Sequence, residues 1–386
     1  MISWNLITRG LRPIGLDIGH NYIKMLQLVI SNRQIGVLAA DKVRIDPKIN
    51  GDGQERRRFV VSAIKQMLAD GNFHGRNVVS CLPSDKLKIT SLRVSETETG
   101  QMEQTLAKEA ANRFALNPDT DAIKYIHAGS VQQGDEVKNE LILFATDNET
   151  IKDHIAMLEE ARLKPVAIDT VPGALFRSFE RSLRRQEDKE HTVVFADIGS
   201  QFTTVVFGRA GEICFVKQIA LGGENFDREI AARLGIEIFE AAMLRSRLRI
   251  ERGLPASEAE LINQDPDKRS QSLDTATRQV IADAIATVAQ ELAREISLCL
   301  RYYTVTFRGK RMERAFLSGG EAYESVLLNV LARTLAVEIE VAQPLKGFDL
   351  SGEGIHINLD GDRRGLLCEW AVAVGLSLKG LDTAVR

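Results

Sequence analysis

Two stretches of the chain repeat one short pattern, and this repeat decides the fold. The first is Ile14-Gly-Leu-Asp-Ile-Gly-His-Asn-Tyr-Ile-Lys-Met-Leu-Gln-Leu-Val-Ile30, and the second is Val193-Val-Phe-Ala-Asp-Ile-Gly-Ser-Gln-Phe-Thr-Thr-Val-Val-Phe207. In each, an apolar strand ends in Asp-Ile-Gly, turns within a few residues and returns as a second strand. The same tripeptide at 17–19 and 197–199 indicates an internal duplication that gives two related lobes.

A strand-turn-strand that contains Asp-x-Gly is suited to phosphate binding. Glycine permits close approach of the main chain, so backbone N–H groups can face a phosphate. The carboxylates of Asp17 and Asp197 would hold a metal-bound water rather than the phosphate itself. One such hairpin is ordinary turn chemistry, and each aspartate alone could simply cap its turn. Two of them at the starts of two lobes predict a site that encloses a nucleoside triphosphate and its Mg²⁺.

Two further glycine-rich elements precede expected helices. Leu221-Gly-Gly-Glu-Asn225 opens a helix expected over 226–234, and Phe316-Leu-Ser-Gly-Gly-Glu321 lies between a strand and a helix expected over 326–335. Each alone would be a helix cap. Together they place small residues and free helix N–H groups where a base, a ribose or a phosphate could dock.

The remaining segments define the domain organisation. Short strands near 35–40 and 42–45 complete a meander after the first hairpin, and a helix is expected over about 54–71. Residues 80–165 contain strands and helices of their own and form an inserted α+β module. The charged run at 184–190 is typical of a solvated linker. We therefore expect the chain to divide into a first lobe of residues 1–79 with 166–190 and 367–386, an inserted subdomain of 80–165, and a second lobe of 191–366.

Composition excludes several classes of protein. The 386 residues are 44% hydrophobic and 27% charged with a net charge of -3, as in an ordinary soluble globular protein of two or three domains. Fifty basic residues balance 53 acidic ones, so the positive charge that nucleic-acid binding requires is missing and no nucleic-acid partner is expected. The sequence has no P-loop, no His-Glu-x-x-His and no Gly-x-Ser-x-Gly motif.

Cysteine spacing and hydropathy indicate an intracellular protein. Four widely spaced cysteines fit neither a zinc site nor a disulfide framework, so we expect buried thiols in a reducing cytoplasm. The longest apolar runs are about strand length, well short of the roughly 20 residues of a membrane-spanning helix. In residues 1–13 the arginines follow the apolar part, the reverse of a signal peptide. This segment could lie on a membrane through Trp4 and Ile7, although packing or fraying is commoner for a terminus.

These motifs resemble those of the actin, sugar kinase and Hsp70 ATPase superfamily over nearly the whole chain. The first hairpin together with Lys24 resembles the first phosphate motif of the superfamily. The second hairpin, with Thr203 and Thr204, resembles the second phosphate motif, and Ser318-Gly-Gly320 resembles the adenosine motif. Ala167–Pro172 and Trp370–Gly375 resemble its two connecting elements. The resemblance implies a two-lobed, ribonuclease H-like α/β fold that binds ATP and Mg²⁺. The residues it assigns to the cofactor are Asp17, Gly19, His20, Asn21, Lys24, Asp197, Gly199, Thr203, Thr204, Gly222, Gly223, Glu224, Arg245, Ser318, Gly319 and Gly320, with Asp17 and Asp197 reaching the metal through water.

Within that superfamily the sequence is most similar to the PilM family of type IV pilus assembly and more distantly to the cell-division protein FtsA. The insertion at 80–165 occupies the place of their extra subdomain, often called 1C or SHS2-like. The resemblance implies a cytoplasmic scaffold that docks the N-terminal tail of a PilN-like inner-membrane protein in a groove beside the insertion. Through this partner and other pilus-assembly components the protein would lie at the inner membrane.

Two departures from the superfamily pattern bear on mechanism. Ala242 and Arg245 stand where nucleotide-binding relatives have a Glu and a Lys that hold the ribose and base. Losing one such contact costs about 1 to 3 kcal/mol, enough to weaken ATP binding roughly tenfold, although Glu240 could compensate. In the first connecting element Asp169 is the only carboxylate that could orient an attacking water through Mg²⁺, so it is the candidate catalytic residue and hydrolysis should be slow or absent.

Several alternatives remain open from the sequence. Lys24 could face solvent, Arg245 could be a charge on a helix surface, and His20 could be solvated rather than touch the γ-phosphate. The same fold also serves active ATPases and small-molecule kinases, but residues 80–165 lack the concentration of Asp, His and Arg that would hold a sugar. A scaffold of cell division or type II secretion is a further alternative. FtsA-like proteins usually end in an amphipathic membrane helix, for which 379–386 is too short and too weakly apolar. The secretion-system relatives are commonly fused to a membrane helix, which is not expected here.

Overall fold

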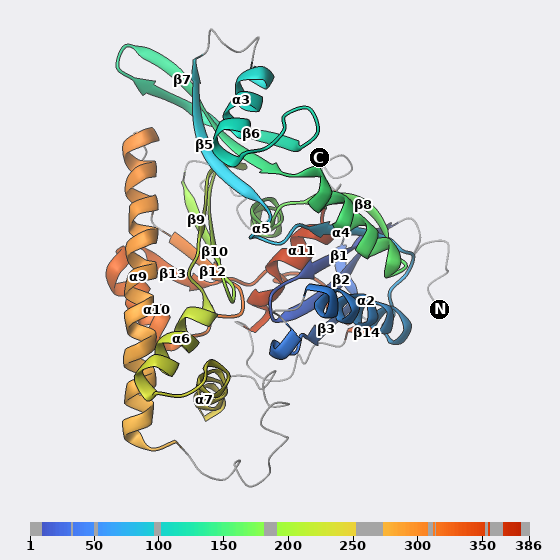
Figure 1. Cartoon of the computed structure of the whole chain (residues 1–386), viewed down its shortest axis with the longest axis vertical. Helices are drawn as coiled ribbons and strands as arrows, with labels where there is room; N and C mark the ends of the chain where they lie inside the picture. The colour runs from blue at the N-terminus through green and yellow to red at the C-terminus, as the bar shows by residue number, and fades with distance from the viewer. Residues whose placement is uncertain are drawn as a thin grey trace.

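Three sheets and their covering helices make up the computed structural model (Figure 1). The described residues are 10–31, 34–49, 53–95, 102–180, 191–251, 273–307, 312, 314–351, 354–355 and 366–379. The membrane-surface interpretation of the N-terminus rests mainly on residues 1–9, and these lie outside the described residues, as does the expected linker at 184–190.

The first lobe is built on a six-stranded sheet in the order β14-β3-β2-β1-β4-β8. Its strands are β1 (Leu11–Ile18), β2 (Tyr22–Ser31), β3 (Gln34–Arg44), β4 (Asn77–Cys81), β8 (Lys164–Asp169) and β14 (Gly354–Ile355). A short 3-10 turn, η1 (Pro47–Ile49), and helix α2 (Gly53–Asp70) follow β3. Val60 and Ile64 of α2 pack on Ile14 of β1, because helical spacing brings these apolar side chains to one face.

One helix near the C-terminus covers the other face of this sheet, and a second helix packs on it and on the second lobe. They are α11 (Ala371–Ser377), which follows η6 (Leu366–Trp370), and α5 (Val171–Glu180). A Cβ at Gly15 would lie 2.1 Å from a carbonyl oxygen of α11, and one at Gly375 would lie 1.8 Å from a carbonyl oxygen of α5. These two glycines therefore allow α11 to pack closely between β1 and α5.

The second lobe repeats the architecture of the first. Its five-stranded sheet has the order β11-β10-β9-β12-β13. The strands are β9 (Val193–Ile198), β10 (Thr203–Arg209), β11 (Glu212–Ile219), β12 (Arg314–Ser318) and β13 (Glu338–Val341), and the helices are α6 (Gly223–Leu234), α7 (Ile238–Glu251), α9 (Thr275–Phe307) and α10 (Ser325–Leu335). Phe195, Phe207 and Tyr303 are fully buried in its core.

The two sheets share one connectivity. β1 pairs antiparallel with β2 and parallel with β4, just as β9 pairs antiparallel with β10 and parallel with β12. The register is the same too, since Asp17 lies opposite Lys24 and Asp197 lies opposite Thr204. The expected two-lobed α/β fold with an internal duplication is therefore confirmed.

A third, three-stranded sheet forms the inserted unit, in the order β5-β7-β6. Its elements are β5 (Lys88–Ser95), α3 (Met102–Phe114), β6 (Ala122–Gln133) and β7 (Glu136–Thr146). One face of the sheet packs on α3, through residues that include Leu92 and Leu106. The other face packs on the second lobe, where Ile142 and Phe144 join the core around Phe207.

Packing gives different limits for the domains from those expected. Helix α4 (Asn148–Glu160) falls inside the expected 80–165 unit, yet its Leu158 is buried in the core of the first lobe, on α2 and β8. Phe348 likewise falls inside the expected second lobe but packs beside Trp370 against the first sheet. We therefore propose that the inserted unit spans 87–146 and that the second lobe ends after β13.

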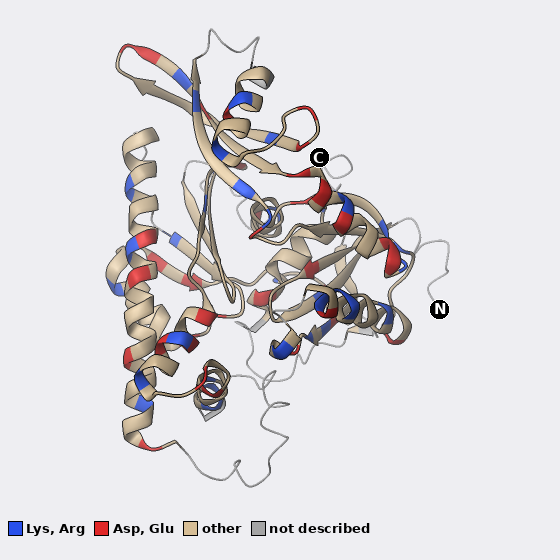
Figure 2. Ribbon diagram, viewed as in Figure 1, with Lys and Arg blue, Asp and Glu red and all other residues tan. Residues whose placement is uncertain are grey.

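The remaining composition-based expectations concern charge, cysteines and membrane helices. Figure 2 shows Lys and Arg interspersed with Asp and Glu over both lobes. All four cysteines are buried free thiols, as expected. Within the described ranges, we find no helix that combines the length and the apolar character of a membrane span.

Candidate functional site

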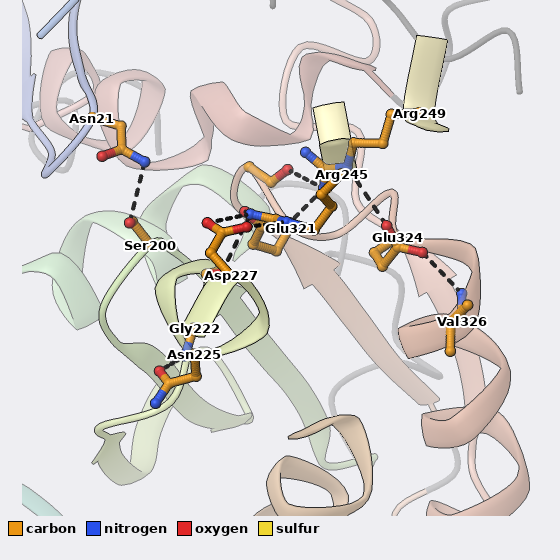
Figure 3. Close-up of polar contacts among 12 residues, drawn as sticks. Asn21, Ser200, Gly222, Asn225, Asp227, Arg245, Arg249, Glu321, Glu324 and Val326 are labelled. Carbon is orange, nitrogen blue, oxygen red and sulfur yellow. Dashed lines mark hydrogen bonds and ion pairs between the residues drawn. The ribbon is translucent and has the colours of Figure 1, made fainter. Parts of the chain in front are cut away.

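The two Asp-Ile-Gly hairpins meet at the cleft between the lobes. In the first, the Gly19 N–H donates to the Tyr22 carbonyl over 2.9 Å, and in the second the Gly199 N–H donates to the Phe202 carbonyl over 3.0 Å. The tips touch each other, because the Asn21 amide donates to the Ser200 hydroxyl over 3.2 Å (Figure 3). Two turns of identical geometry thus face one space from opposite lobes.

Lys24 lies inside the cleft rather than in solvent. Its ammonium is 3.2 Å from the Asp17 carboxylate across the β1–β2 pair. Desolvation alone would lower the pKa of this buried lysine, but Asp17, Glu369 and Asp197 raise it well above its ordinary value. Lys24 therefore carries a fixed positive charge between the two hairpins.

Asp197 is the second carboxylate of the cleft. Burial, followed by the nearby Asp17, raises its pKa from 3.8 to about 6, although Lys24 and a hydrogen bond from Ser318 oppose the rise. The Ser318 hydroxyl donates to Asp197 Oδ1 over 2.9 Å. A cation bound between the hairpins would relieve this unfavourable charge.

The Gly319-Gly320 step follows β12 and borders the cleft. Gly319 has φ +91°, and a Cβ there would lie 2.3 Å from the Ile198 carbonyl oxygen, so the position requires glycine. A Cβ at Gly320 would meet no described atom within 4 Å. The backbone at Gly320 is thus open to a flat group such as a base.

The first N–H groups of α6 bond to the second hairpin. The Gly223 and Glu224 N–H groups donate to the carbonyls of Gly199 and Ser200 over 3.0 and 2.8 Å. A Cβ at Gly222 would lie 2.5 Å from both of these carbonyl oxygens. This corrects the expectation of free helix N–H groups, because the second hairpin already uses them.

Arg245 lies in a buried ion-pair network at the far end of the cleft (Figure 3). Its guanidinium is 2.7 Å from Asp227 of α6 and 2.6 Å from Glu321 after β12. Arg249 adds a contact of 2.7 Å to Glu321. The two carboxylates raise the pKa of Arg245 despite its burial, and both arginines lower the pKa of Glu321. The network joins α6, α7 and the glycine turn, and excludes the interpretation of Arg245 as a helix-surface charge.

These elements enclose a single cavity of about 1220 Å³. Most of the residues expected to contact the cofactor line it, namely Asp17, Gly19, His20, Asn21, Lys24, Asp197, Gly199, Thr204, Arg245, Gly319 and Gly320. The expected residues that do not line it are Thr203, Gly222, Gly223, Glu224 and Ser318. Thr203 instead donates its hydroxyl to the Leu221 carbonyl over 2.7 Å, because alternate residues of β10 face opposite sides of the sheet.

Asp169, the candidate catalytic residue, is held in ion pairs and does not line the cavity. One carboxylate oxygen lies 2.9 Å from Arg177 of α5 and 3.0 Å from Lys379 after α11. The other accepts the Thr170 N–H over 2.8 Å. Asp169 belongs to the contact between α5 and the end of α11, and it does not line the cavity.

Sequence reasoning missed Arg56, which anchors the first hairpin. Its guanidinium donates to the carbonyls of Gly19 and His20 over 2.8 and 3.0 Å. Arg56 belongs to α2, where a run of three arginines gives no indication of which one turns inward. Lys42 was also missed; it pairs with Glu369 over 2.9 Å at the cleft wall.

On one side of the first hairpin the cavity extends between α2, α4 and the segment after β4. We call this part of the cavity the recess. It is lined by Arg56, Arg57, Val60, Leu82, Pro83, Ser84, Asp85, Lys86, Thr150, Asp153, His154 and Met157. Burial lowers the pKa of His154 to about 4, and this ring lies 3.2 Å from the Ser80 hydroxyl. The His154 side chain is therefore uncharged at neutral pH.

The two lobes and their hairpins define a protein with the actin-like ATPase fold. A family model described as "Type IV pilus assembly protein PilM" matches residues 15–381, so the chain belongs to this family. The structure is similar to a chain of a solved "PilM-PilN type IV pilus biogenesis complex", with 22% identity over 96% of this chain and 99% of that one and a TM-score of 0.73. It also shares its fold with the ethanolamine utilization protein EutJ from Carboxydothermus hydrogenoformans, with 12% identity over 97% and 94% of the chains and a TM-score of 0.52.

Proposed function

We propose that this protein is an actin-like scaffold of type IV pilus assembly that binds Mg²⁺ and ATP between its hairpins and docks the cytoplasmic tail of a PilN-like protein. The observation that carries the nucleotide part is the pair of equivalent Asp-Ile-Gly turns on one cavity. The scaffold part rests on membership of the PilM family.

The residues of the cleft fit a magnesium nucleotide. Lys24 offers a positive charge to phosphate oxygens, and Gly19 and Gly199 allow the triphosphate to approach the main chain. Asp17 and Asp197 would hold Mg²⁺ through water, since carboxylates are ligands that this ion prefers. The bound metal would neutralise the phosphates. Gly319 and Gly320 would border the adenosine.

Arg245 acts as a positioning residue in this proposal. Its donors are engaged by Asp227 and Glu321, so it holds the adenosine end of the cleft in shape instead of gripping the base. With Asp169 paired to Arg177 and Lys379, the first connecting element offers no carboxylate to the cleft. Asp17 and Asp197 are placed for metal binding, and the cleft carboxylates Asp227, Glu321 and Glu369 are paired with Arg245 or Lys42. Slow or absent hydrolysis follows from this arrangement.

The recess supports the docking of an extended tail. It lies at the edge of the first lobe beside the inserted unit and is continuous with the nucleotide cleft. Its walls combine apolar side chains such as Val60 and Met157 with polar ones such as Ser84 and Thr150. An extended peptide gains affinity from main-chain hydrogen bonds and a few side-chain pockets, so a micromolar Kd, about -8 kcal/mol, is expected.

Thermal unfolding with and without Mg²⁺ and ATP tests the nucleotide site. The Asp197→Ala and Gly199→Val variants should lose the ligand-dependent rise in Tm that the wild type shows. Equal rises in variants and wild type would place the nucleotide elsewhere.

Calorimetry with a peptide of about ten residues from the tail of a PilN-like protein tests the recess. Ser84→Trp should fill the recess and abolish binding, whereas Ser62→Trp, on the exposed face of α2, is the matched control. Full affinity in the Ser84→Trp variant would mean that the tail docks elsewhere.

A further inference from the structure

The inserted unit belongs to the first lobe by sequence but to the second lobe by packing. Leu87, Ala128, Ile142 and Phe144 are all buried in the core of the second lobe, together with Phe207. Figure 1 shows α9 extending along the second lobe toward the inserted sheet. Strands β5 and β6 contact β11, and β6 also contacts the C-terminal part of α9.

A buried polar cluster reinforces this contact. Glu140 of β7 is 1% exposed and accepts hydrogen bonds from the Tyr302 hydroxyl over 2.6 Å and from Arg93 Nε over 2.8 Å. Arg93 also donates to the Thr306 hydroxyl over 3.1 Å. Tyr302 and Thr306 are residues of α9, so the cluster joins the inserted sheet to the second lobe. The buried carboxylate of Glu140 needs the hydrogen bonds from both Tyr302 and Arg93. We call these residues the Glu140 cluster.

The recess is lined by helices of the first lobe and by the connector that leads to the inserted unit. Val60 and Met157 lie on α2 and α4, which pack in the core of the first lobe. The connector Leu82–Lys86 also lines the recess, and it leads from β4 of the first lobe to Leu87 in the core of the second lobe. The Thr146 hydroxyl also donates to the Lys86 carbonyl over 2.9 Å, which ties this connector to the end of β7.

We infer that the inserted unit moves as one body with the second lobe, so that closure of the cleft on a nucleotide changes the width of the tail recess. The inference rests on the proposed function and adds the regulation of its two sites. Packed cores move as units because their contacts are lost together, whereas the connector and the short link after Thr146 can change their backbone angles. Nucleotide and tail then alter each other's affinity by one common factor.

Distances between spin labels test the movement in the full chain. One pair joins the inserted unit to the second lobe, Lys124→Cys with Arg294→Cys, and the other joins it to the first lobe, Lys124→Cys with Lys65→Cys. All three positions are exposed, and the native cysteines are buried. With Mg²⁺ and a non-hydrolysable ATP analogue, the first distance should stay constant and the second should change. A change in the first distance, or constancy of both while thermal shift shows bound nucleotide, would overturn the inference. No nucleotide binding at all would instead refute the proposed function.

Binding measurements test the consequence. The Kd of the tail peptide should change about tenfold between the nucleotide-free and nucleotide-bound wild type, within the usual range for coupled sites. In Glu140→Gln and Tyr302→Phe variants the factor should fall toward one, while each ligand alone binds as before, because neither residue lines the cavity. Arg113→Gln, at an exposed ion pair on α3, is the control and should keep the full factor. Equal peptide affinity with and without nucleotide in the wild type, with both ligands bound, would contradict the coupling.

Discussion

Replacing Asp197 by Asn should stabilise the nucleotide-free protein, although the residue is central to the proposed site. Burial and Asp17 raise its pKa from 3.8 to about 6, so ionisation of Asp197 is unfavourable in the folded state. At about 1.4 kcal/mol for each tenfold change in proton affinity, the charge costs about 3 kcal/mol of folding free energy. Asn removes the charge and keeps an oxygen that can accept the Ser318 hydroxyl.

The sign of the pH dependence follows from the raised pKa. The folded state holds the Asp197 proton more tightly, so stability is lost as pH rises from about 4 to about 6, and the cost is complete above that. The gain in the free energy of unfolding from Asp197→Asn should therefore be about 3 kcal/mol at pH 8 and about half of this at pH 5.

Urea unfolding at pH 5 and pH 8, without nucleotide, provides the measurement. Glu321→Gln is the matched control, because it removes a carboxylate whose pKa is lowered by Arg245 and Arg249. The stabilisation of the folded state by ionised Glu321 is present above the ordinary pKa of 4.5 and is lost on acidification. The Glu321→Gln variant should therefore be destabilised, by about 3 kcal/mol at pH 8. A pH-independent gain for Asp197→Asn, or a loss, would refute the reasoning.

Three other substitutions test separate parts of the site. Gly319→Ala should cost about 1 to 3 kcal/mol in urea unfolding because of its positive φ and the Ile198 carbonyl, whereas Gly320→Ala should leave stability within about 0.5 kcal/mol. Arg56→Gln should weaken ATP binding roughly tenfold in calorimetry by releasing the first hairpin, and Arg58→Gln, an exposed neighbour, should not. Asp169→Asn should leave ATP turnover unchanged, because Asp169 lies outside the cavity; a fall in turnover with intact folding would restore a catalytic role.

The sequence predicts the sheets better than their packing. A repeated tripeptide between apolar strands is a local signal, and it identified both hairpins and the position of Asp17 and Asp197 on one cleft. The helix pattern of α4 is equally local, but it does not state which core receives Leu158. Only the fold shows that α4 completes the first lobe while Ile142 and Phe144 join the second.

Within the site, too, local patterns predict which segments take part but not the role of each residue. Thr203 and Thr204 are identical in sequence terms, yet strand alternation sends only Thr204 toward the cavity. The sequence left open a base contact for Arg245, but in the structure Arg245 pairs with Glu321, which lies 76 residues later in the chain. Asp169 is similar, since Lys379 is 210 positions away and its ion pair with Asp169 exists only in the folded chain. Long-range ion pairs leave no spacing in the sequence that could predict them.

A crystal structure of the protein with Mg²⁺ and a non-hydrolysable ATP analogue tests the central claim most directly. We predict the triphosphate between Gly19 and Gly199, with the metal near Asp17 and Asp197 and the base beside Gly320. A nucleotide bound outside this cavity, or a cleft that stays empty in crystals at saturating ligand while binding is detected in solution, would contradict it.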